Sequence, residues 1–264
     1  LAELGASRGM KLLPTADSDG NVDTTAASAV DTVFILPDIS NYTRFMTGTQ
    51  FSFGHAQYII FSLINAMISA ATKRVELSKL EGDAALFFVD AGRLSTTEVG
   101  ETVMDIFRSF YGERRRLKES NICPCRACRH IDELDLKVFV HRGQAARFRF
   151  RGSVDLFGTD VIVLHRIMKN SVRGHRYIMI TDAAADSVVL PDSARNFAVE
   201  EDIEHIGRIR ASVIEIDDTT AAQLAESQRD VDGRRISAIR ESVRKLRENL
   251  RWLVSSMSAA RKGH

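Results

Sequence analysis

The chain has 264 residues, enough to bury a sizeable core in one large domain or two small ones. Its composition, 44% hydrophobic and 27% charged residues, is that of a globular protein, and a net charge of +1 gives no overall attraction to nucleic acid or acidic membranes. We find neither a membrane-spanning apolar run nor the apolar stretch of a secretory signal. The three cysteines lie within 123–128 and do not form a disulfide framework, so a cytoplasmic location is expected.

Hydrophobic periodicity predicts an α+β fold, in which hairpins and crossover helices build one sheet covered by helices. The expected elements in chain order are a buried strand over 32–40, a short helix from Asn41, a helix over 54–74, strands over 75–80 and 84–90, a helix over 95–119 with Thr96 or Thr97 as N-cap, strands over 135–143 and 144–152 joined near Gly143, a helix over 158–170, a strand over 175–181, a short helix from Asp182, and a strand over 208–217. We therefore expect a flexible leader over 1–30, a domain over 31–218 and a helical tail over 219–264.

The tail carries a narrow apolar stripe at alternating steps of three and four residues. Its members are Ile236, Ile239, Val243, Leu246, Leu250, Leu253 and Met257. This pattern favours a dimerising coiled coil. Ten Lys/Arg against four Asp/Glu over 229–264 leave open a helix on an anionic membrane surface, with Trp252 at the interface, or packing onto its own domain.

Two acidic residues lie where predicted strands end. Asp38 ends the first buried strand, and Asp83 lies in the hairpin turn of "KLEGDAALFF". Carboxylates held at strand ends can bind Mg²⁺ and leave coordination positions open for phosphate oxygens. Alternatively, Asp38 caps the helix that starts at Asn41, and Asp83 only forms a turn beside Gly82.

Three segments together resemble the class III nucleotidyl cyclase catalytic domain. They are "FILPDISNYTRFM", "KLEGDAALFF" and "DLFGTDVIVLHRI", and the resemblance extends over about residues 32 to 217. The segment "CPCRAC" before "LKVFVH" is similar to an uncharacterised cyclase-like branch. The resemblance implies a ferredoxin-like cyclase-type sheet, a head-to-tail homodimer with the active site at its interface, and conversion of ATP to 3′,5′-cyclic AMP and pyrophosphate.

The resemblance also implies roles for individual residues. Two Mg²⁺ or Mn²⁺ ions would be held by Asp38 and Asp83 with the carbonyl of Ile39. Adenine would be read by Lys79 and Asp155, because a donor and an acceptor complement its N1 and its 6-amino group. The transition state would be stabilised by Arg166, and the triphosphate would be bound by Arg208 or Arg210.

Each of these residues also has a purely structural interpretation. Lys79 is then a hairpin lysine with a solvated ammonium group. Asp155 is a turn residue before Gly158, and Arg208 and Arg210 are solvated residues on a strand face.

One position departs from the family pattern. The family has an Asn four residues before the arginine, where this chain has Ile162. Loss of one preorganised donor typically costs about 10²–10³ in rate. His165 or Asn170 are candidate substitutes, although His165 is also explained as a packed helix residue. A nucleotide-binding regulatory module that does not turn over is therefore the alternative, and a membrane or nucleic-acid adaptor acting through the basic tail is a third hypothesis.

The segment "CPCRACRH" groups Cys123, Cys125, Cys128 and His130. Four such ligands suit one structural Zn²⁺. Free thiols in a loop, or an inter-subunit disulfide under oxidation, are the other interpretations.

Overall fold

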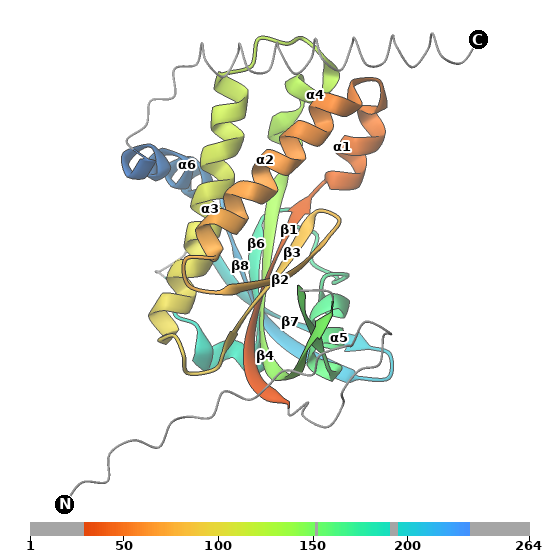
Figure 1. Cartoon of the computed structure of the whole chain (residues 1–264), viewed down its shortest axis with the longest axis vertical. Coiled ribbons are helices and arrows are strands. Elements are labelled where there is room, and N and C mark those ends of the chain that lie inside the picture. Colours follow the sequence, from red (N-terminus) through yellow and green to blue (C-terminus); the bar gives the residue numbers. More distant parts are fainter. Residues whose placement is uncertain (1–28, 151–152, 191–194, 233–264) are drawn as a thin grey trace, which may run out of the picture.

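A mixed sheet is the centre of the structure, a computed structural model that describes residues 29–150, 153–190 and 195–232 (Figure 1). Its strands are β1 (Val30–Ser40), β2 (Glu76–Glu81), β3 (Ala84–Asp90), β4 (Asp135–Phe150), β5 (Ser153–Phe157), β6 (Tyr177–Thr181), β7 (Arg195–Ile203) and β8 (Gly207–Glu215). They lie in the order β2-β3-β1-β4-β6-β8-β7, and β5 pairs with the second half of β4. The β4–β6 pairing is parallel and the other pairings are antiparallel.

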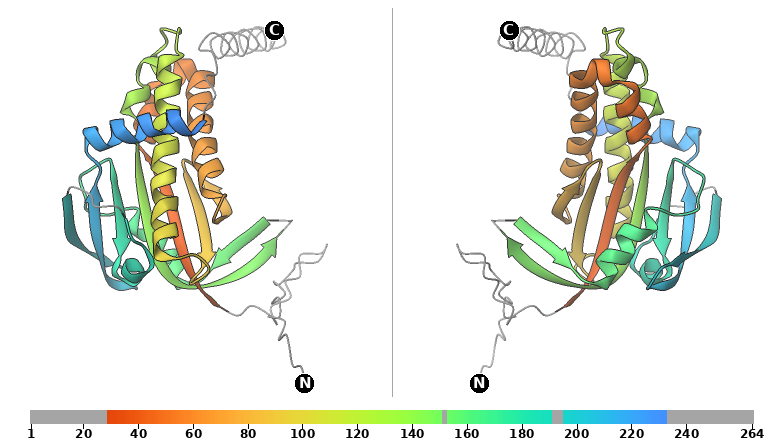
Figure 2. Two further views of the ribbon diagram at one scale, coloured as in Figure 1. Left: turned by 90° about the vertical axis from the view of Figure 1, so that its left-hand side faces the viewer. Right: turned by 90° about the vertical axis from the view of Figure 1, so that its right-hand side faces the viewer.

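Helices cover both faces of this sheet. They are α1 (Tyr42–Gly48), η2 (Gln50–Ser52), α2 (Phe53–Ala71), α3 (Thr96–Glu119), α4 (Arg126–Arg129), η3 (Ile131–Glu133), α5 (Thr159–Ile167), η4 (Asp182–Ser187) and α6 (Asp218–Asp232), of which the η elements are 3₁₀ helices. One buried cluster joins the sheet to α2 and α3, and a second joins its other face to α5. Figure 2 shows the β4–β5 and β7–β8 hairpins extending to opposite sides of the molecule. The predicted α+β architecture is confirmed.

Side-chain alternation along β1 decides which face its last residues occupy. Val33 and Ile35 pack in the α2–α3 cluster, whereas Phe34 and Leu36 pack in the α5 cluster. Successive side chains of a strand point to opposite faces of the sheet. Asp38 therefore lies on the α5 side.

A buried polar network fixes the end of the sheet where β1 finishes. Asp135 is the register partner of Ser40 and begins β4. Its carboxylate accepts hydrogen bonds from Tyr111 Oη at 2.7 Å and from Arg176 Nε at 2.8 Å. These bonds connect α3, β4 and the segment before β6. They therefore stabilise the structure around the end of β1.

The N-cap of α3 differs from the prediction. Ser95, not Thr96 or Thr97, is the cap: its side chain accepts from the backbone N–H of Glu98, and the Glu98 carboxylate accepts from the N–H of Ser95. This reciprocal pair is a capping box, which satisfies two backbone donors at once. The Ser-x-x-Glu spacing in the sequence was the signal for it.

Gly143 does not join two strands, which corrects the prediction for this region. Strand β4 runs through it, and the chain turns back only after Phe150, into β5. A Cβ at Gly143 would lie 2.1 Å from Cγ of Asp160, whose carboxylate accepts from the N–H of Gln144 at 2.6 Å. The glycine is required because α5 approaches the strand closely, and not because the chain turns there.

The sequence pattern did not predict β5 and β7. Strand β5 pairs with the projecting half of β4, and β7 forms the edge of the sheet beside β8. The β7 sequence "RNFAVEEDI" is largely polar because an edge strand is exposed to solvent. The alternation of polar and apolar residues in this segment is therefore too weak to distinguish a strand from a loop.

One helical stretch in the described part of the chain, Gln50–Ala71, is long and apolar enough to cross a membrane by length and composition, with a mean hydropathy of 1.2. A helix was predicted over 54–74, but the prediction that the chain has no apolar run of membrane-spanning length is wrong by this criterion. Its buried residues are Ala56, Ile59, Ile60, Leu63, Ile64, Met67, Ala70 and Ala71. They pack in the α2–α3 cluster, and this core role accounts for the apolar composition.

The start of the predicted tail packs on the domain. Ala221 and Leu224 of α6 join the α2–α3 cluster, and Glu226 lies 3.5 Å from Arg115 of α3. Residues 1–28 of the predicted leader and the apolar stripe of the predicted coiled coil lie outside the described residues, and Val30, which was assigned to the leader, begins β1.

Candidate functional site

The two predicted acidic residues come together beside the β2–β3 turn. Asp38 is the register partner of Ala84, so Asp83, one residue before Ala84, lies next to it. Gly82 has a φ of 66°, which allows the tight turn that leads into Asp83. Asn41, not Asp38, is the N-cap residue of α1. The interpretation of Asp38 as a helix cap is therefore excluded.

The electrostatics of this acidic pair favour a bound cation. Burial, followed by the negative charge of Asp38, raises the pKa of Asp83 to about 7. Burial also raises the pKa of Asp38, an effect that the charge of Lys137 opposes. The β1–β3 pairing ends at Asp38, so the backbone of Ile39 has no partner on β3. Two partly buried carboxylates, one of which raises the pKa of the other, next to a backbone segment that pairs with β4 but not with β3, fit a hard divalent cation with oxygen ligands.

Lys137 is a neighbour of this pair that the sequence analysis did not single out. It is the register partner of Asp38 on β4, and its Nζ lies 5.4 Å from the centroid of the Tyr177 ring. Burial raises the pKa of Tyr177 to about 12, and the charge of Asp38 contributes to this rise. A lysine within the otherwise apolar run "LKVFV" was the sequence signal. Lys137 supplies part of the positive charge that a metal would otherwise have to supply.

Lys79 and Asp155 are brought together from β2 and β5. Lys79 Nζ lies 3.1 Å from Asp155 Oδ1 and 3.2 Å from Glu81 Oε1. Burial lowers the pKa of Lys79, but the hydrogen bonds that its ammonium group donates to Asp155 and Glu81 outweigh burial and leave the pKa raised. His165 of α5 joins this network, with its Nδ1 3.0 Å from Glu81 Oε2. Asp155 lies within a strand, so the alternative of a turn residue is wrong.

Helix α5 presents the predicted transition-state residue on its exposed side. Arg166 is exposed, and Ile162, one turn before it, is 52% exposed. The two side chains therefore share one face of the helix. Asn170 donates to the carbonyl of Ile167 and to Tyr177 Oη, both at 2.8 Å. Asn170 thus fixes the end of α5 and is not placed to replace the missing donor.

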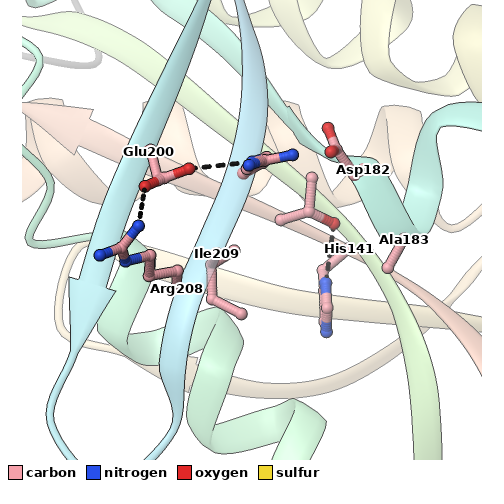
Figure 3. Close-up of a pocket in the computed structure, with 8 residues that line it drawn as sticks. His141, Asp182, Ala183, Glu200, Arg208 and Ile209 are labelled. Carbon is pink, nitrogen blue, oxygen red and sulfur yellow. Dashed lines mark hydrogen bonds and ion pairs between the residues drawn. The ribbon is translucent and has the colours of Figure 1, made fainter.

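Arg208 and Arg210 lie away from the acidic pair within one chain. They line a pocket of about 400 Å³, shown in Figure 3, in which both form ion pairs with Glu200. Ala211 and Val213 pack on the α5 face of β8, so alternation places both arginines on the opposite face from Asp38. Measured parallel to the strands, Arg210 and Asp38 are about 15 Å apart.

The same pocket contains a buried histidine between two hydrogen-bond partners. His141 Nδ1 lies 2.8 Å from Thr181 Oγ1 (Figure 3), and its Nε2 lies 3.3 Å from Asp160 Oδ1. Burial lowers the pKa of His141, while Asp160 opposes the change. These bonds attach the first turn of α5 to β4 and to the end of β6. We therefore assign His141 a structural role.

The cysteine cluster forms, but its histidine differs from the predicted one. Nitrogen or sulfur atoms of His55, Cys123, Cys125 and Cys128 all lie within 4.8 Å of one another. His130 instead lies 2.6 Å from Glu133, with Nδ1 facing Oε1. Its place is taken by a residue of α2 that is remote in sequence, so no local spacing could have identified it.

A relative with close sequence similarity is the uncharacterised protein Rv2561/Rv2562 of Mycobacterium tuberculosis (strain ATCC 25618 / H37Rv). The two are 34% identical over 156 residues, which cover 58% of this chain and 72% of that protein. A family model described as a protein of unknown function, DUF2652, matches residues 60–177.

Solved structures of nucleotide cyclases share the fold of the chain. The catalytic core of a rhodopsin-guanylyl cyclase with converted specificity, in complex with ATPαS, has a TM-score of 0.51 and 14% identity, over 70% of this chain and 96% of that one. A bacterial light-regulated adenylyl cyclase gives 0.53 and 12%, over 78% of this chain and 59% of that one. The guanylyl cyclase Cya2 gives 0.50 and 11%, over 71% and 93%. The predicted cyclase-type fold is confirmed.

Proposed function

The chain belongs to the same family as the Mycobacterium tuberculosis protein Rv2561/Rv2562, and we propose that it is a nucleotidyl cyclase that converts ATP to 3′,5′-cyclic AMP and pyrophosphate. The observation that carries this proposal is the meeting of Asp38 and Asp83 at the end of β1, in a fold shared with nucleotide cyclases. Neither residue is needed there for capping or for core packing.

In this reaction the ribose 3′-oxygen attacks the α-phosphorus, the bond from that phosphorus to the bridging oxygen breaks, and pyrophosphate leaves. Two Mg²⁺ or Mn²⁺ ions held by Asp38, Asp83 and the carbonyl of Ile39 would lower the pKa of the 3′-hydroxyl and neutralise triphosphate charge. The carboxylates would hold these ions at a rigid strand end and would position the phosphate groups through them. The protein itself needs to supply little covalent chemistry.

The purine is selected by the Lys79–Asp155 pair. The ammonium of Lys79 carries three protons, so it can keep its contact with Asp155 at 3.1 Å and still donate to adenine N1. Asp155 accepts from the 6-amino group of adenine. Guanine presents the opposite donor and acceptor pattern at these two positions, so the pair favours ATP over GTP.

Arg166 would act on a nucleotide held between two copies of the chain. Its guanidinium is exposed and forms no ion pair with the residues that the structure describes. Large apolar side chains are exposed around it and around the Lys79–Asp155 pair, namely Leu80 at 48%, Phe157 at 71% and Ile162 at 52%. A second copy of the chain would bury them, as expected for a head-to-tail homodimer.

The test measures cyclic nucleotide formed by the purified full chain with Mn²⁺ and either ATP or GTP. We expect cyclic AMP from ATP, and a loss of at least about 10²-fold for Asp38→Asn or Asp83→Asn. Glu204→Gln, an equal loss of charge at the exposed β7–β8 turn, is the matched control and should leave the rate unchanged. Absence of product from the wild type at high enzyme concentration would refute the proposal.

A second function, metal-dependent nucleotide binding without turnover, is favoured by one observation. Ile162 occupies the exposed face of α5 one turn before Arg166, where it offers no donor to the reacting phosphate. In that case calorimetry detects Mn²⁺-dependent binding of ATP, while the wild type forms no product. Ile162→Asn, which restores a donor worth about 10²-fold in rate, should then form measurable cyclic nucleotide, and Ile162→Leu, which adds no donor, should not.

A further inference from the structure

The cysteine cluster joins two parts of the chain that are distant in sequence. His55 lies in the first turn of α2, whereas Cys123, Cys125 and Cys128 belong to the connection between α3 and β4 that contains α4. Cys128 is 5% exposed and the other three residues are half-buried. The cluster is at the end of the molecule where α1, α2 and α4 meet (Figure 1).

The separations within the cluster match one tetrahedral ion. His55 Nδ1 lies 3.2 Å from Cys125 Sγ and 3.4 Å from Cys128 Sγ, and all four ligand atoms lie within 4.8 Å of one another. Four ligands at ordinary zinc bond lengths lie about 3.5–3.8 Å from each other in a tetrahedron. Only small side-chain movements are needed to reach this arrangement.

The backbone around the cysteines is shaped by bonds that do not use the thiols. The N–H of Cys123 donates to Asn121 Oδ1 at 2.9 Å, and Asn121 Nδ2 donates to the carbonyl of Cys128 at 3.3 Å. The N–H of Ala127 donates to Ser52 Oγ at 3.3 Å, which ties α4 to the start of α2. Asn121 thus closes the segment into a loop, and Ser52 places that loop against His55.

We propose that His55, Cys123, Cys125 and Cys128 bind one Zn²⁺ in a structural site. Thiolate and imidazole ligands suit zinc and exclude Mg²⁺, which prefers oxygen. Four protein ligands complete a tetrahedron and leave no open position, which distinguishes a structural zinc site from a catalytic one. The ion would connect α2 with the α3–β4 connection. Since α1 leads from Asp38 to α2, the ion would also stabilise the helices that follow the acidic pair.

The same thiols could instead remain reduced without metal or form a disulfide. A disulfide would join two of the three sulfurs and leave His55 without a role. The two alternatives predict different effects of the His55 variant: removal of His55 weakens a zinc site but leaves thiol oxidation unchanged.

The test uses the full chain purified in reductant and measures zinc by mass spectrometry of the metal. We expect about one zinc per chain in the wild type and in His130→Ala, and zinc affinity at least about tenfold weaker in His55→Ala. The His130 variant is the matched control because it removes a nearby histidine that lies outside the cluster. Equal zinc affinity in His55→Ala and the wild type, measured as the zinc that each retains against a competing chelator, would refute the assignment of His55.

Cobalt substitution provides a second measurement that does not depend on a folded His55 variant. Co²⁺ added to the metal-free wild type should give the intense visible absorption of a tetrahedral site and thiolate-to-cobalt charge-transfer bands. Both should disappear when Zn²⁺ is added. A wild-type chain with three titratable thiols and no cobalt spectrum would overturn the proposal. Neither measurement depends on cyclase activity, so failure of one proposal would not be mistaken for failure of the other.

Discussion

Asp83 is the residue whose ionisation reports most directly on the acidic pair. Its pKa is raised from 3.8 to about 7, mainly by burial and then by Asp38. Between these pH values the folded chain holds a proton that the unfolded chain has lost. The contribution of Asp83 to the free energy of unfolding therefore falls as pH rises from about 4 to about 7, and this loss persists above pH 7.

We expect this effect to be about 1–2 kcal/mol, because the side chain is only partly buried and solvent screens its charge. Urea unfolding in Mg²⁺-free buffer at pH 5 and pH 8 measures it as a difference between the wild type and Asp83→Asn. The stability of the variant relative to the wild type should be greater at pH 8 than at pH 5, where only part of the loss has occurred. The same pH dependence in both proteins would show that Asp83 ionises freely.

Mg²⁺ should restore the stability that the chain loses at high pH when Asp83 ionises. A proton and a cation compete for the same carboxylate, so millimolar Mg²⁺ should raise the melting temperature of the wild type more at pH 8 than at pH 6. Asp83→Asn should lose this response, and Glu204→Gln should keep it. Mg²⁺ has little affinity for thiolates, so the cysteine cluster does not contribute to the signal. An undiminished response in Asp83→Asn would place the metal elsewhere.

Several site residues could be found from the sequence because short segments carry them at fixed spacing. Asp38 lies near the end of a predictable strand and Asp83 in a predictable hairpin turn, and the strand register brings them together. His55 and Lys137 could not be found in this way. His55 meets the cysteines only through the packing of α2 against α4, and Lys137 meets Asp38 only through the β1–β4 pairing. Such contacts between distant segments depend on tertiary structure, which periodicity does not encode.

At the scale of elements, the predicted turn at Gly143 was wrong, and substitution of this glycine can test the reason. The strand continues through this glycine because Asp160 occupies the space of its missing side chain. Gly143→Ala should therefore destabilise the chain by about 1–3 kcal/mol through steric overlap, measured by urea unfolding. Gly48→Ala is the matched control, since its Cβ would lie 3.5 Å from the flexible Arg126 side chain.

A double variant separates steric overlap from loss of backbone freedom. If the cost of Gly143→Ala comes from Asp160, the substitution should cost little in a chain that already carries Asp160→Gly, which also removes the Asp160 Cβ that would lie 2.5 Å from the added methyl group. An equal cost in both backgrounds would contradict the close-approach explanation.

At the scale of the whole molecule, the buried strands and amphipathic helices were predictable because each has a strong apolar period. Strand β1 and helices α2 and α3 are examples, and together they were enough to predict the α+β class. The edge strand β7 and the β4–β5 hairpin were not predictable, because their exposed faces mix polar and apolar residues. The hairpin exposes Phe157 at 71%, which makes it a candidate surface for a second copy of the chain.

If the active site lies at the interface of a head-to-tail dimer, two different inactive variants should restore activity when they pair. Each active site would take Asp38 and Asp83 from one copy and Lys79, Asp155 and Arg166 from the other. Asp38→Ala and Arg166→Ala should each be inactive alone. In a mixed dimer, one of the two sites receives both defects and the other receives none. Co-expressed in equal amounts, the variants should therefore recover about a quarter of the wild-type rate of cyclic AMP formation, since half of the dimers are mixed.

The matched control combines two defects from the same half of the site. Co-expressed Asp38→Ala and Asp83→Ala leave every site with a damaged acidic pair, so the rate should not recover. Recovery in the first mixture and not in the second would assign the acidic pair and Arg166 to different copies of the chain. If neither mixture recovers activity although mixed dimers are isolated by two affinity tags, one chain must supply both halves of the site.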